Sequence, residues 1–515
     1  FSRTLTLFVF CIWAGNSFSQ SVQNELSLAG AWELALDPQS TGPTQLTFDK
    51  AIQLPGTLGE AKFGNPVSLP PGTASRQVLQ TGVLKTISYA GKAWYRKGIT
   101  IPPWAKGKTA ILTLERVLWK STVYVDGKAV GSQNSLSTPH RHDLTTSLGP
   151  GPHEIMICVD SSQQFKFIGA GTGYGRPWNG ILGDLRIRFF DRSHISKASI
   201  HPDAGNRTVR IRLFGQFSPE AREQIRFTLT EKAGGKPVAE SVLPINPSNE
   251  YSLNLKSEVT PWEEFSPALY ILESSLIRSG KPVHTRTDVF GFRKIESVGK
   301  RLLLNGSPVF LRGTLGRMST MRGEQTIMDP AGFKGLFKVA RAYGLNHMRF
   351  HSSCPPAAAF EAADEMGFYL QVECPIWNVT FGKDADVVSY ITEEGKRILN
   401  EYGNHPSFCL MSIGNEMEGD FKVMTDLISI FKATDSRMLF TTTSFTFQKG
   451  PDGYPQPVDD FFVTQWTDAG WVRGQYVFDN EYPRFDQDYT RTSAHLPVPL
   501  ITHEVGQHTV YPNLR

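Results

Sequence analysis

Carboxyl groups follow two strand-like segments in the second half of this sequence. Glu416 comes directly after Phe408–Ile413, and Glu504 comes directly after Pro499–Thr502. Cleavage of a glycosidic bond needs one carboxyl group that protonates the leaving oxygen and a second that attacks the sugar or activates water. If these segments are strands of one sheet, the two carboxylates are candidates for that chemistry.

The residues that follow the other strand-like segments are of the kinds that bind a sugar. Tryptophan can stack on the apolar side of a sugar ring, while Asn, Arg, His and carboxylate side chains can bond its hydroxyls. The candidates for substrate contact are Arg349, His351, Glu373, Trp377, Asn415, Trp466 and His503.

Some of these residues have a second interpretation that the sequence leaves open. Glu373 either contacts substrate or holds Arg349 in an ion pair, and Arg349 itself either lines the sugar site or orients Glu504. Glu504 taken alone could be a capping or salt-bridged carboxylate, and the two tryptophans could belong to the core. Asp364 and Glu365 lie on a predicted helix, where we expect solvated carboxylates.

Such a site needs a scaffold that brings strand ends together, and strand-like and helix-like segments alternate after residue 300. The predicted strands are Val309–Gly313, Leu345–Phe350, Phe368–Glu373, Phe408–Ile413, Met438–Thr442, Phe461–Gln465 and Pro499–Thr502. The predicted helices are Pro330–Tyr343, Pro356–Met366, Asp386–Tyr402 and Phe421–Ala433. This alternation favours a TIM-type (β/α)-barrel, in which chemistry takes place at the C-terminal ends of the strands.

The first half of the chain has β character throughout. Residues 22–192 contain short strand-like runs separated by turn signals, which predicts a sandwich of jelly-roll size. Residues 195–293 repeat this pattern over about one hundred residues and predict an immunoglobulin-like sandwich. We therefore expect three domains, with the catalytic barrel over residues 294–515.

Composition excludes several function classes. The chain has 515 residues, is 40 % hydrophobic and carries a net charge of +4, without a block of like charges for nucleic acid. After the first twenty positions no apolar run is long enough to span a membrane. No cysteine pair or His/Asp/Glu cluster has metal-ligand spacing, so we expect no cofactor, and a metal is neither implied nor excluded.

The first residues have the pattern of an export signal. Arg3 precedes the apolar run Leu5–Ala14, and small residues stand at the −3 and −1 positions before Gln20. Residues 1–19 therefore predict a secreted or periplasmic protein; the alternative is a buried N-terminal strand or helix. Because the chain begins with Phe1 rather than Met, we expect this N-terminus to be clipped.

Several motifs resemble glycoside hydrolase family 2, which comprises β-galactosidases, β-glucuronidases and β-mannosidases. The resemblance runs from about residue 25 to the end of the chain and rests on an ordered set of motifs. These motifs are Ala93–Arg96, Val123–Gly127, Asp143–Thr145, Trp178–Ile181, Phe290–Arg293, Leu304–Gly306, Met348–His351, Asn404–Ser407 and Gly414–Glu416.

The resemblance implies a retaining exo-β-glycosidase with named roles. Glu416 is similar to the general acid/base, Asn415 to the residue that bonds the sugar 2-hydroxyl, and Glu504 to the nucleophile. Arg349 and His351 match positions that line the sugar site. The carboxyl groups of retaining enzymes lie ~5–5.5 Å apart.

Two departures from the family pattern matter. Val505–Gln507 differs from the tyrosine-containing sequence that follows the nucleophile in familiar β-galactosidases and β-glucuronidases. The identity of the sugar that is cleaved therefore stays open. The chain stops at Arg515, about a dozen residues after the seventh strand, so we expect the last βα unit to be missing. The leading hypothesis is a β-galactosidase. The alternatives are a β-glucuronidase, a β-mannosidase, an arabinosidase or a non-catalytic carbohydrate-binding protein, and the sequence does not indicate an oligomeric state.

Overall fold

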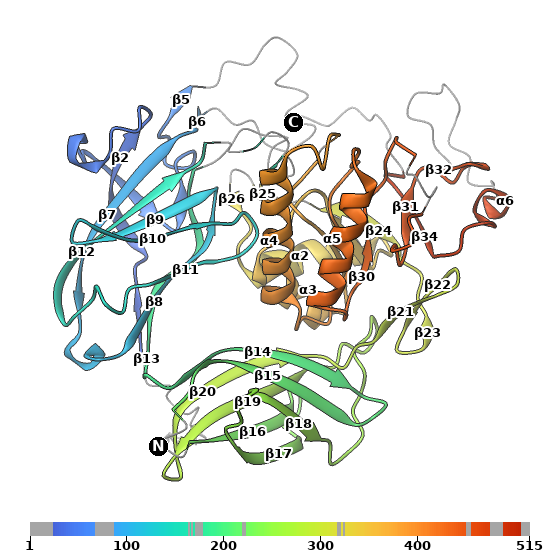
Figure 1. Cartoon of the computed structure of the whole chain (residues 1–515), viewed down its shortest axis with the longest axis horizontal. Coiled ribbons are helices and arrows are strands. Elements are labelled where there is room, and N and C mark those ends of the chain that lie inside the picture. Colours follow the sequence, from blue (N-terminus) through green and yellow to red (C-terminus); the bar gives the residue numbers. More distant parts are fainter. Residues whose placement is uncertain are drawn as a thin grey trace, which may run out of the picture.

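The computed structural model describes residues 24–66, 87–162, 165, 168–169, 179–218, 223–316, 321–322, 325–377, 379–449, 455–473 and 488–505. The predicted export signal (1–19), Trp178 and Gln507 lie outside these ranges. Three regions follow one another along the chain, blue, green and yellow-to-red in Figure 1. Among the described residues, no helix has the length and apolar character needed to cross a membrane.

The first region is a sandwich of two antiparallel sheets. One has the order β1 (Glu25–Ser27), β13 (Gly180–Phe190), β8 (Thr109–Val117) and β11 (His140–Asp143), with β4 (Gly56–Thr57) beside β13. The other has the order β10 (Lys128–Asn134), β9 (Lys120–Val125), β12 (Gly151–Asp160), β7 (Lys92–Ile101), β2 (Gly30–Asp37) and β3 (Lys50–Leu54). Alternation decides which side chains face inward: in β9, Val123 and Val125 are buried while Thr122 and Tyr124 are partly exposed.

The second region is a smaller sandwich, at the bottom of Figure 1. Its sheets have the orders β14 (His194–Asp203), β15 (Thr208–Gln216), β18 (Glu250–Asn254), and β17 (Pro237–Pro244), β16 (Gln224–Glu231), β19 (Tyr270–Arg278), β20 (Lys281–Phe290). Side chains from both sheets, including Ile211 and Phe227, form one buried core. A short meander follows, made of β21 (Ile295–Val298), β22 (Arg301–Leu304) and β23 (Ser307–Pro308).

The third region contains the parallel sheet that carries the candidate site. Its order is β24 (Gly313–Gly316), β27 (His347–Phe350), β28 (Tyr369–Glu373), β29 (Phe408–Ser412) and β30 (Leu439–Thr441). Parallel bridges from Ser444 to Asn415 and Val463 continue it into the parallel pair β31 (Phe462–Thr464) and β34 (Leu500–Thr502). Among the described residues, no strand pairs with the outer edges of β24 and β34.

The helices of this region begin and end where the sequence predicts. They are α2 (Pro330–Ala342), α3 (Ala357–Met366), α4 (Ala385–Tyr402) and α5 (Phe421–Thr434), each confirmed to within one residue at either end. The side chains of Asp329, Asp384 and Asp420 accept backbone N–H bonds at the starts of α2, α4 and α5. A short helix α6 (Thr490–Ser493) lies in the stretch before β34.

Two sequence predictions are wrong in this region. The strand predicted at Val309–Gly313 begins only at Gly313, because the Asn346 side chain bonds the Arg312 N–H (2.8 Å) and the Phe310 carbonyl (3.1 Å), groups that a ladder would use. Asp364 is not solvated: it is 3 % exposed and accepts bonds from His405 Nδ1 (2.5 Å) and Ser407 N (3.0 Å).

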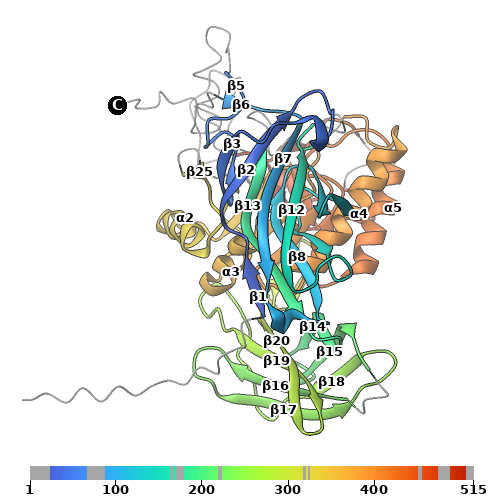
Figure 2. The ribbon, with the colours of Figure 1, turned by 90° about the vertical axis from the view of Figure 1, so that its left-hand side faces the viewer.

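The first sandwich packs against the helices of the third region, and Figure 2 shows this sandwich facing the viewer with α4 and α5 beyond it. Its side chains Leu118, Trp119, Leu136 and Ile168 belong to the buried core built mainly by the parallel region. The Trp119 ring lies 5.8 Å from the ring of Tyr390 on α4. The two regions therefore share one hydrophobic core.

Candidate active site

Most of the predicted site residues come from the carboxyl ends of the parallel strands. Arg349 is on β27 and His351 follows it, Glu373 ends β28, Asn415 and Glu416 follow β29, and His503 and Glu504 follow β34. Trp377 lies on the loop after β28. Trp466 lies in the hairpin of β32 (Trp466–Thr467) and β33 (Gly470–Trp471), opposite Trp471.

The backbone at these strand ends is strained. Ser352, Glu416, Phe445 and Glu504 have φ angles of 45°, 46°, 69° and 49°, in the left-handed region that side-chain-bearing residues rarely adopt. Each such residue costs ~1–2 kcal/mol, and strain of this kind clusters at functional sites. At Glu416 the conformation is held by two bonds, Glu416 N to Ser444 O (3.1 Å) and Met417 N to Thr443 Oγ1 (2.9 Å).

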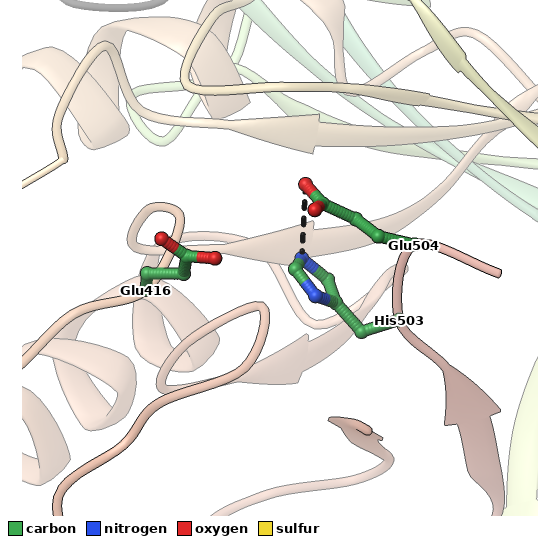
Figure 3. Close-up of side chains that lie close together, drawn as sticks. All are labelled: Glu416, His503 and Glu504. Carbon is green, nitrogen blue, oxygen red and sulfur yellow. Dashed lines mark ion pairs between the residues drawn. The ribbon is translucent and has the colours of Figure 1, made fainter. Parts of the chain in front are cut away.

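The carboxylates of Glu416 and Glu504 face each other, with His503 beside them (Figure 3). One carboxylate oxygen of each glutamate and one ring nitrogen of His503 all lie within 4.8 Å of one another. Inverting glycosidases separate their carboxyl groups by ~6.5–9.5 Å to admit a water, and retaining ones by ~5–5.5 Å. These carboxylate oxygens therefore lie closer together than the separation typical of inverting enzymes.

Arg349 connects most of the site. Its Nη1 donates to Glu373 at 2.6 Å and to Asn415 Oδ1 at 3.2 Å, while Nη2 lies 3.3 Å from His503 Nε2 and 3.5 Å from Glu504 Oε1. Both oxygens of Glu373 have protein donors, since Oε2 accepts from Ser352 N at 2.6 Å. Of the two interpretations of Glu373, the structure shows the ion pair with Arg349, and Arg349 also contacts Glu504.

The surroundings give the ionisable groups different proton affinities. Burial, reinforced by the nearby charge of Glu504, raises the pKa of Glu416 to about 7. Burial would also raise the pKa of Glu373, but Arg349 and His351 outweigh it and hold that pKa below its usual value. Burial, together with Arg349, keeps the pKa of His503 well below its ordinary value, so His503 is neutral.

The neutral residues complete the walls of the site. Asn415 is fully buried; its Oδ1 accepts from Arg349 and lies 3.1 Å from His503 Nε2, and among the described residues its Nδ2 has no partner. The half-buried ring of Trp377 meets His351 edge-on at 5.4 Å and bonds the Glu416 carboxylate. An unpaired amide donor beside two carboxylates is suited to a substrate hydroxyl.

Two residues of the site were not predicted from the sequence. Phe445 stacks on the His503 ring at 5.2 Å, and Arg473 donates to the backbone carbonyl of Glu504 at 2.9 Å. The end of the fifth predicted strand was a signal for Phe445. Arg473 lies in a stretch without apolar periodicity, where no sequence signal marks it.

Among the described residues, three side chains of the site could also converge on a metal ion. Glu416, His503 and Glu504 could offer a ligand atom each. The guanidinium of Arg349, 3.3 Å from His503 Nε2 and 3.5 Å from Glu504, places a positive charge where a cation would bind. This charge disfavours a metal ion at the three donors.

Comparison with known proteins finds similarity to glycoside hydrolases. The family described as Glycosyl hydrolases family 2 matches residues 193–293 of this chain. A β-galactosidase of Streptococcus thermophilus is 22 % identical over 443 residues, which cover 80 % of this chain and 42 % of that protein. This chain spans about half or less of the length of the first curated relatives it matches.

Solved structures share the fold. A β-glucuronidase from Ruminococcus gnavus superposes with a TM-score of 0.70 at 18 % identity, over 87 % of this chain and 77 % of that one. A glycosyl hydrolase family 2 member from Bacteroides cellulosilyticus superposes with a TM-score of 0.63 at 17 % identity, over 81 % of this chain and 57 % of that one.

Proposed function

We infer that this chain, which belongs to glycoside hydrolase family 2, hydrolyses terminal β-linked sugars with retention of configuration. The observation that carries the proposal is the pair Glu416 and Glu504, whose carboxylate oxygens approach within 4.8 Å at the ends of β29 and β34. The ionisation of Glu416 supports it as well, because burial and the charge of Glu504 raise the pKa of Glu416 to about 7.

In the first step, Glu504 attacks the anomeric carbon while Glu416 donates its proton to the departing oxygen. The raised pKa keeps a large fraction of Glu416 protonated near neutral pH. Arg349, whose Nη2 lies 3.5 Å from Glu504, orients the nucleophile and stabilises its charge before attack. Asn415 Nδ2 is available to a hydroxyl of the same sugar.

In the second step, Glu416 removes a proton from the water that cleaves the glycosyl–enzyme ester. Formation of the ester neutralises Glu504, and the charge of Glu504 is one cause of the raised pKa of Glu416. The pKa of Glu416 therefore falls once the intermediate exists, which suits the change from acid to base.

The sugar that we propose is β-galactose, the substrate named for the Streptococcus thermophilus relative. β-Glucuronides form the second group to test, because the Ruminococcus gnavus neighbour is a β-glucuronidase. β-Mannosides and arabinosides remain further alternatives. A non-catalytic sugar-binding protein has no need for two carboxylates held this close.

The same proposal extends to architecture and location. We propose that the first sandwich is a jelly roll, the second immunoglobulin-like, and the parallel region part of a TIM-type barrel. We also propose that residues 1–19 direct export, so that the enzyme meets its substrate outside the cytoplasm. Mass spectrometry of the protein recovered from the medium or periplasm, with Gln20 as its first residue, would support export; an uncleaved cytoplasmic product would contradict it.

The test of function uses the full-length protein and a panel of p-nitrophenyl β-D-galactoside, β-D-glucuronide, β-D-mannoside and α-L-arabinoside. We expect turnover of one of them, and a first-formed product with the anomeric configuration of the substrate by NMR. Glu504→Gln should abolish turnover, because no ester can form. The control is Glu393→Gln, the same change at an exposed position of α4, which should leave turnover unchanged.

Absence of activity on every glycoside, or an inverted product, would overturn the proposal. Azide distinguishes the two roles. It should restore turnover in Glu416→Ala with a product of retained configuration, and in Glu504→Ala with a product of inverted configuration, because azide then replaces the base or the nucleophile respectively. The opposite result would exchange the two assignments.

A further inference from the structure

The first sandwich holds two loops of the candidate active site. Arg116 of β8 donates from Nη2 to the Pro355 carbonyl, in the loop after β27, at 2.9 Å. Gly169 N donates to the Pro375 carbonyl, in the loop after β28, at 2.6 Å, and Ile168 forms an antiparallel bridge with Ile376. These contacts cross from one region to the other immediately beside the predicted site.

Two of the residues that make these contacts are buried, whereas Gly169 is partly exposed. Ile168 and Arg116 are each 1 % exposed. The Arg116 guanidinium also donates to Leu136 O (3.1 Å) and to the Tyr402 hydroxyl (3.3 Å), so it joins β8 to α4. Ile168 packs into the core cluster that also contains Ile376 and Ile413.

The loop after β28, which the first sandwich contacts, in turn contacts the predicted acid/base Glu416 and its neighbour Asn415. Asn415 N donates to Ile376 O at 3.3 Å, and Trp377 bonds the Glu416 carboxylate. The backbones at Ile376 and Gly414 are in close contact, because a Cβ added at Gly414 would lie 2.4 Å from Ile376 O. A shift of Ile376 therefore moves the backbone that sets the left-handed turn at Glu416.

We propose that Ile168 and Gly169 of the first sandwich are positioning residues for the acid/base Glu416, acting through Pro375–Trp377. Neither belongs to the residues predicted to contact substrate. They hold the segment that fixes the Glu416 turn and its bond to Trp377, so proton donation depends on them while nucleophilic attack by Glu504 does not. The inference rests on the proposed glycosidase function.

The experiment measures kcat/KM of the full-length protein, which reports the first step, on glycosides that differ only in their leaving group. The 2,4-dinitrophenolate leaving group departs without protonation. The methoxy group of a methyl glycoside must be protonated by the general acid as it leaves. We expect Ile168→Ala to lower kcat/KM ~10–100-fold for the methyl glycoside and less than ~3-fold for the dinitrophenyl glycoside. The larger loss is a part of the ~10²–10⁴-fold that acid catalysis contributes.

A second variant addresses the backbone bond. Gly169 has a φ of 73°, and Gly169→Pro would remove its N–H and impose a φ near −65°. Gly169→Ala keeps the N–H at a moderate cost in strain, so it should show the same leaving-group dependence in weaker form. Thermal melts of both variants establish that they are folded at the assay temperature.

The matched control is Arg141→Ala, which removes another contact between the same two regions. Arg141 pairs with Glu401 on α4 at 2.6 Å, away from the loops of the site. This variant should behave like the unmodified protein on both substrates. If Ile168→Ala and Gly169→Pro are folded and lose activity equally on both leaving groups, or lose none, the positioning role is wrong. Failure of the proposed function would instead show as an unmodified protein inactive on both glycosides.

Discussion

Glu416 and Glu504 are identical side chains that the fold treats differently. Both sit at left-handed turns after parallel strands. Glu504 lies 3.5 Å from Arg349 and 3.6 Å from His503 Nε2, whereas burial and the charge of Glu504 raise the pKa of Glu416 to about 7. One carboxyl group is thereby suited to attack and the other to carry a proton.

The pH dependence follows from the state of Glu416. Because the acid must be protonated, kcat/KM should fall tenfold per pH unit above about 7, the pKa of Glu416. Trp377→Phe removes a hydrogen bond to the ionised Glu416 carboxylate and keeps most of the apolar cover, so the pKa of Glu416 should rise. The alkaline limb of the kcat/KM profile should therefore move to higher pH. Trp104→Phe, at an exposed position of the first sandwich, is the control and should not move it. A limb that stays in place or moves to lower pH would contradict this account.

The ion pair of Arg349 and Glu373 contributes to stability as well as to the site. Its side chains are 9 % and 0 % exposed. Arg349→Met should lower the free energy of unfolding by ~3–5 kcal/mol, because it leaves the buried charge of Glu373 without its cationic partner. The double variant with Glu373→Gln should recover much of this loss in urea titrations.

The control for that measurement is an exposed pair of similar geometry. Arg96 and Glu33 lie 2.7 Å apart with exposed fractions of 33 % and 55 %. Arg96→Met should cost less than ~1 kcal/mol, because exposed pairs are screened by water. Equal losses in the two single variants would show that burial does not set the cost.

At the level of elements, packing between helices overrides local preference. Gly395 lies inside α4 and its own sequence context gives no reason for a glycine. A Cβ built there would lie 2.1 Å from the Phe431 ring of α5. The glycine is required because the two helices approach closely at this point.

Gly395→Ala tests which effect dominates. Helix propensity alone would stabilise the variant by ~0.8–1.0 kcal/mol. We expect destabilisation by ~1–3 kcal/mol instead, because the methyl group overpacks a fixed ring. Phe431→Leu in the same chain should relieve much of the clash. A melting temperature higher than that of the unmodified protein would show that α4 and α5 can separate freely.

At the level of the whole molecule, buried polar contacts join the first sandwich to the helices of the parallel region. Glu394 of α4 is fully buried and accepts bonds from Leu136 N at 2.8 Å and Ser135 Oγ at 3.1 Å. In Figure 1, α4 is the helix of this region that faces the blue sandwich. The active-site loops and this contact lie on the same interface.

Glu394→Ala should loosen that interface. It leaves the buried Leu136 N–H without an acceptor, which should cost ~1–3 kcal/mol. Calorimetry should then show the first sandwich unfolding separately from the parallel region. Glu393→Ala, at the neighbouring exposed position, is the control and should leave a single transition. An unchanged calorimetric profile in Glu394→Ala would mean that apolar contacts alone couple the two regions.

The sequence by itself determined the order of elements and the chemical kinds present. The helices are confirmed to within one residue, because their N-terminal aspartates or prolines and their apolar periodicity are local signals. Arg349, Asn415, Glu416 and Glu504 could be predicted to lie close together, since each stands at the end of a predicted parallel strand and such strands end at one edge of a sheet.

Only the tertiary structure decided what those residues touch and how they ionise. The pairing of Glu373 with Arg349, the burial of Asp364, the stacking of Phe445 on His503 and the bond from Arg473 to Glu504 all join segments distant in sequence. The pKa of Glu416 likewise depends on burial and on a charge from another strand. Such effects are set by distances across the fold, which local sequence patterns do not contain.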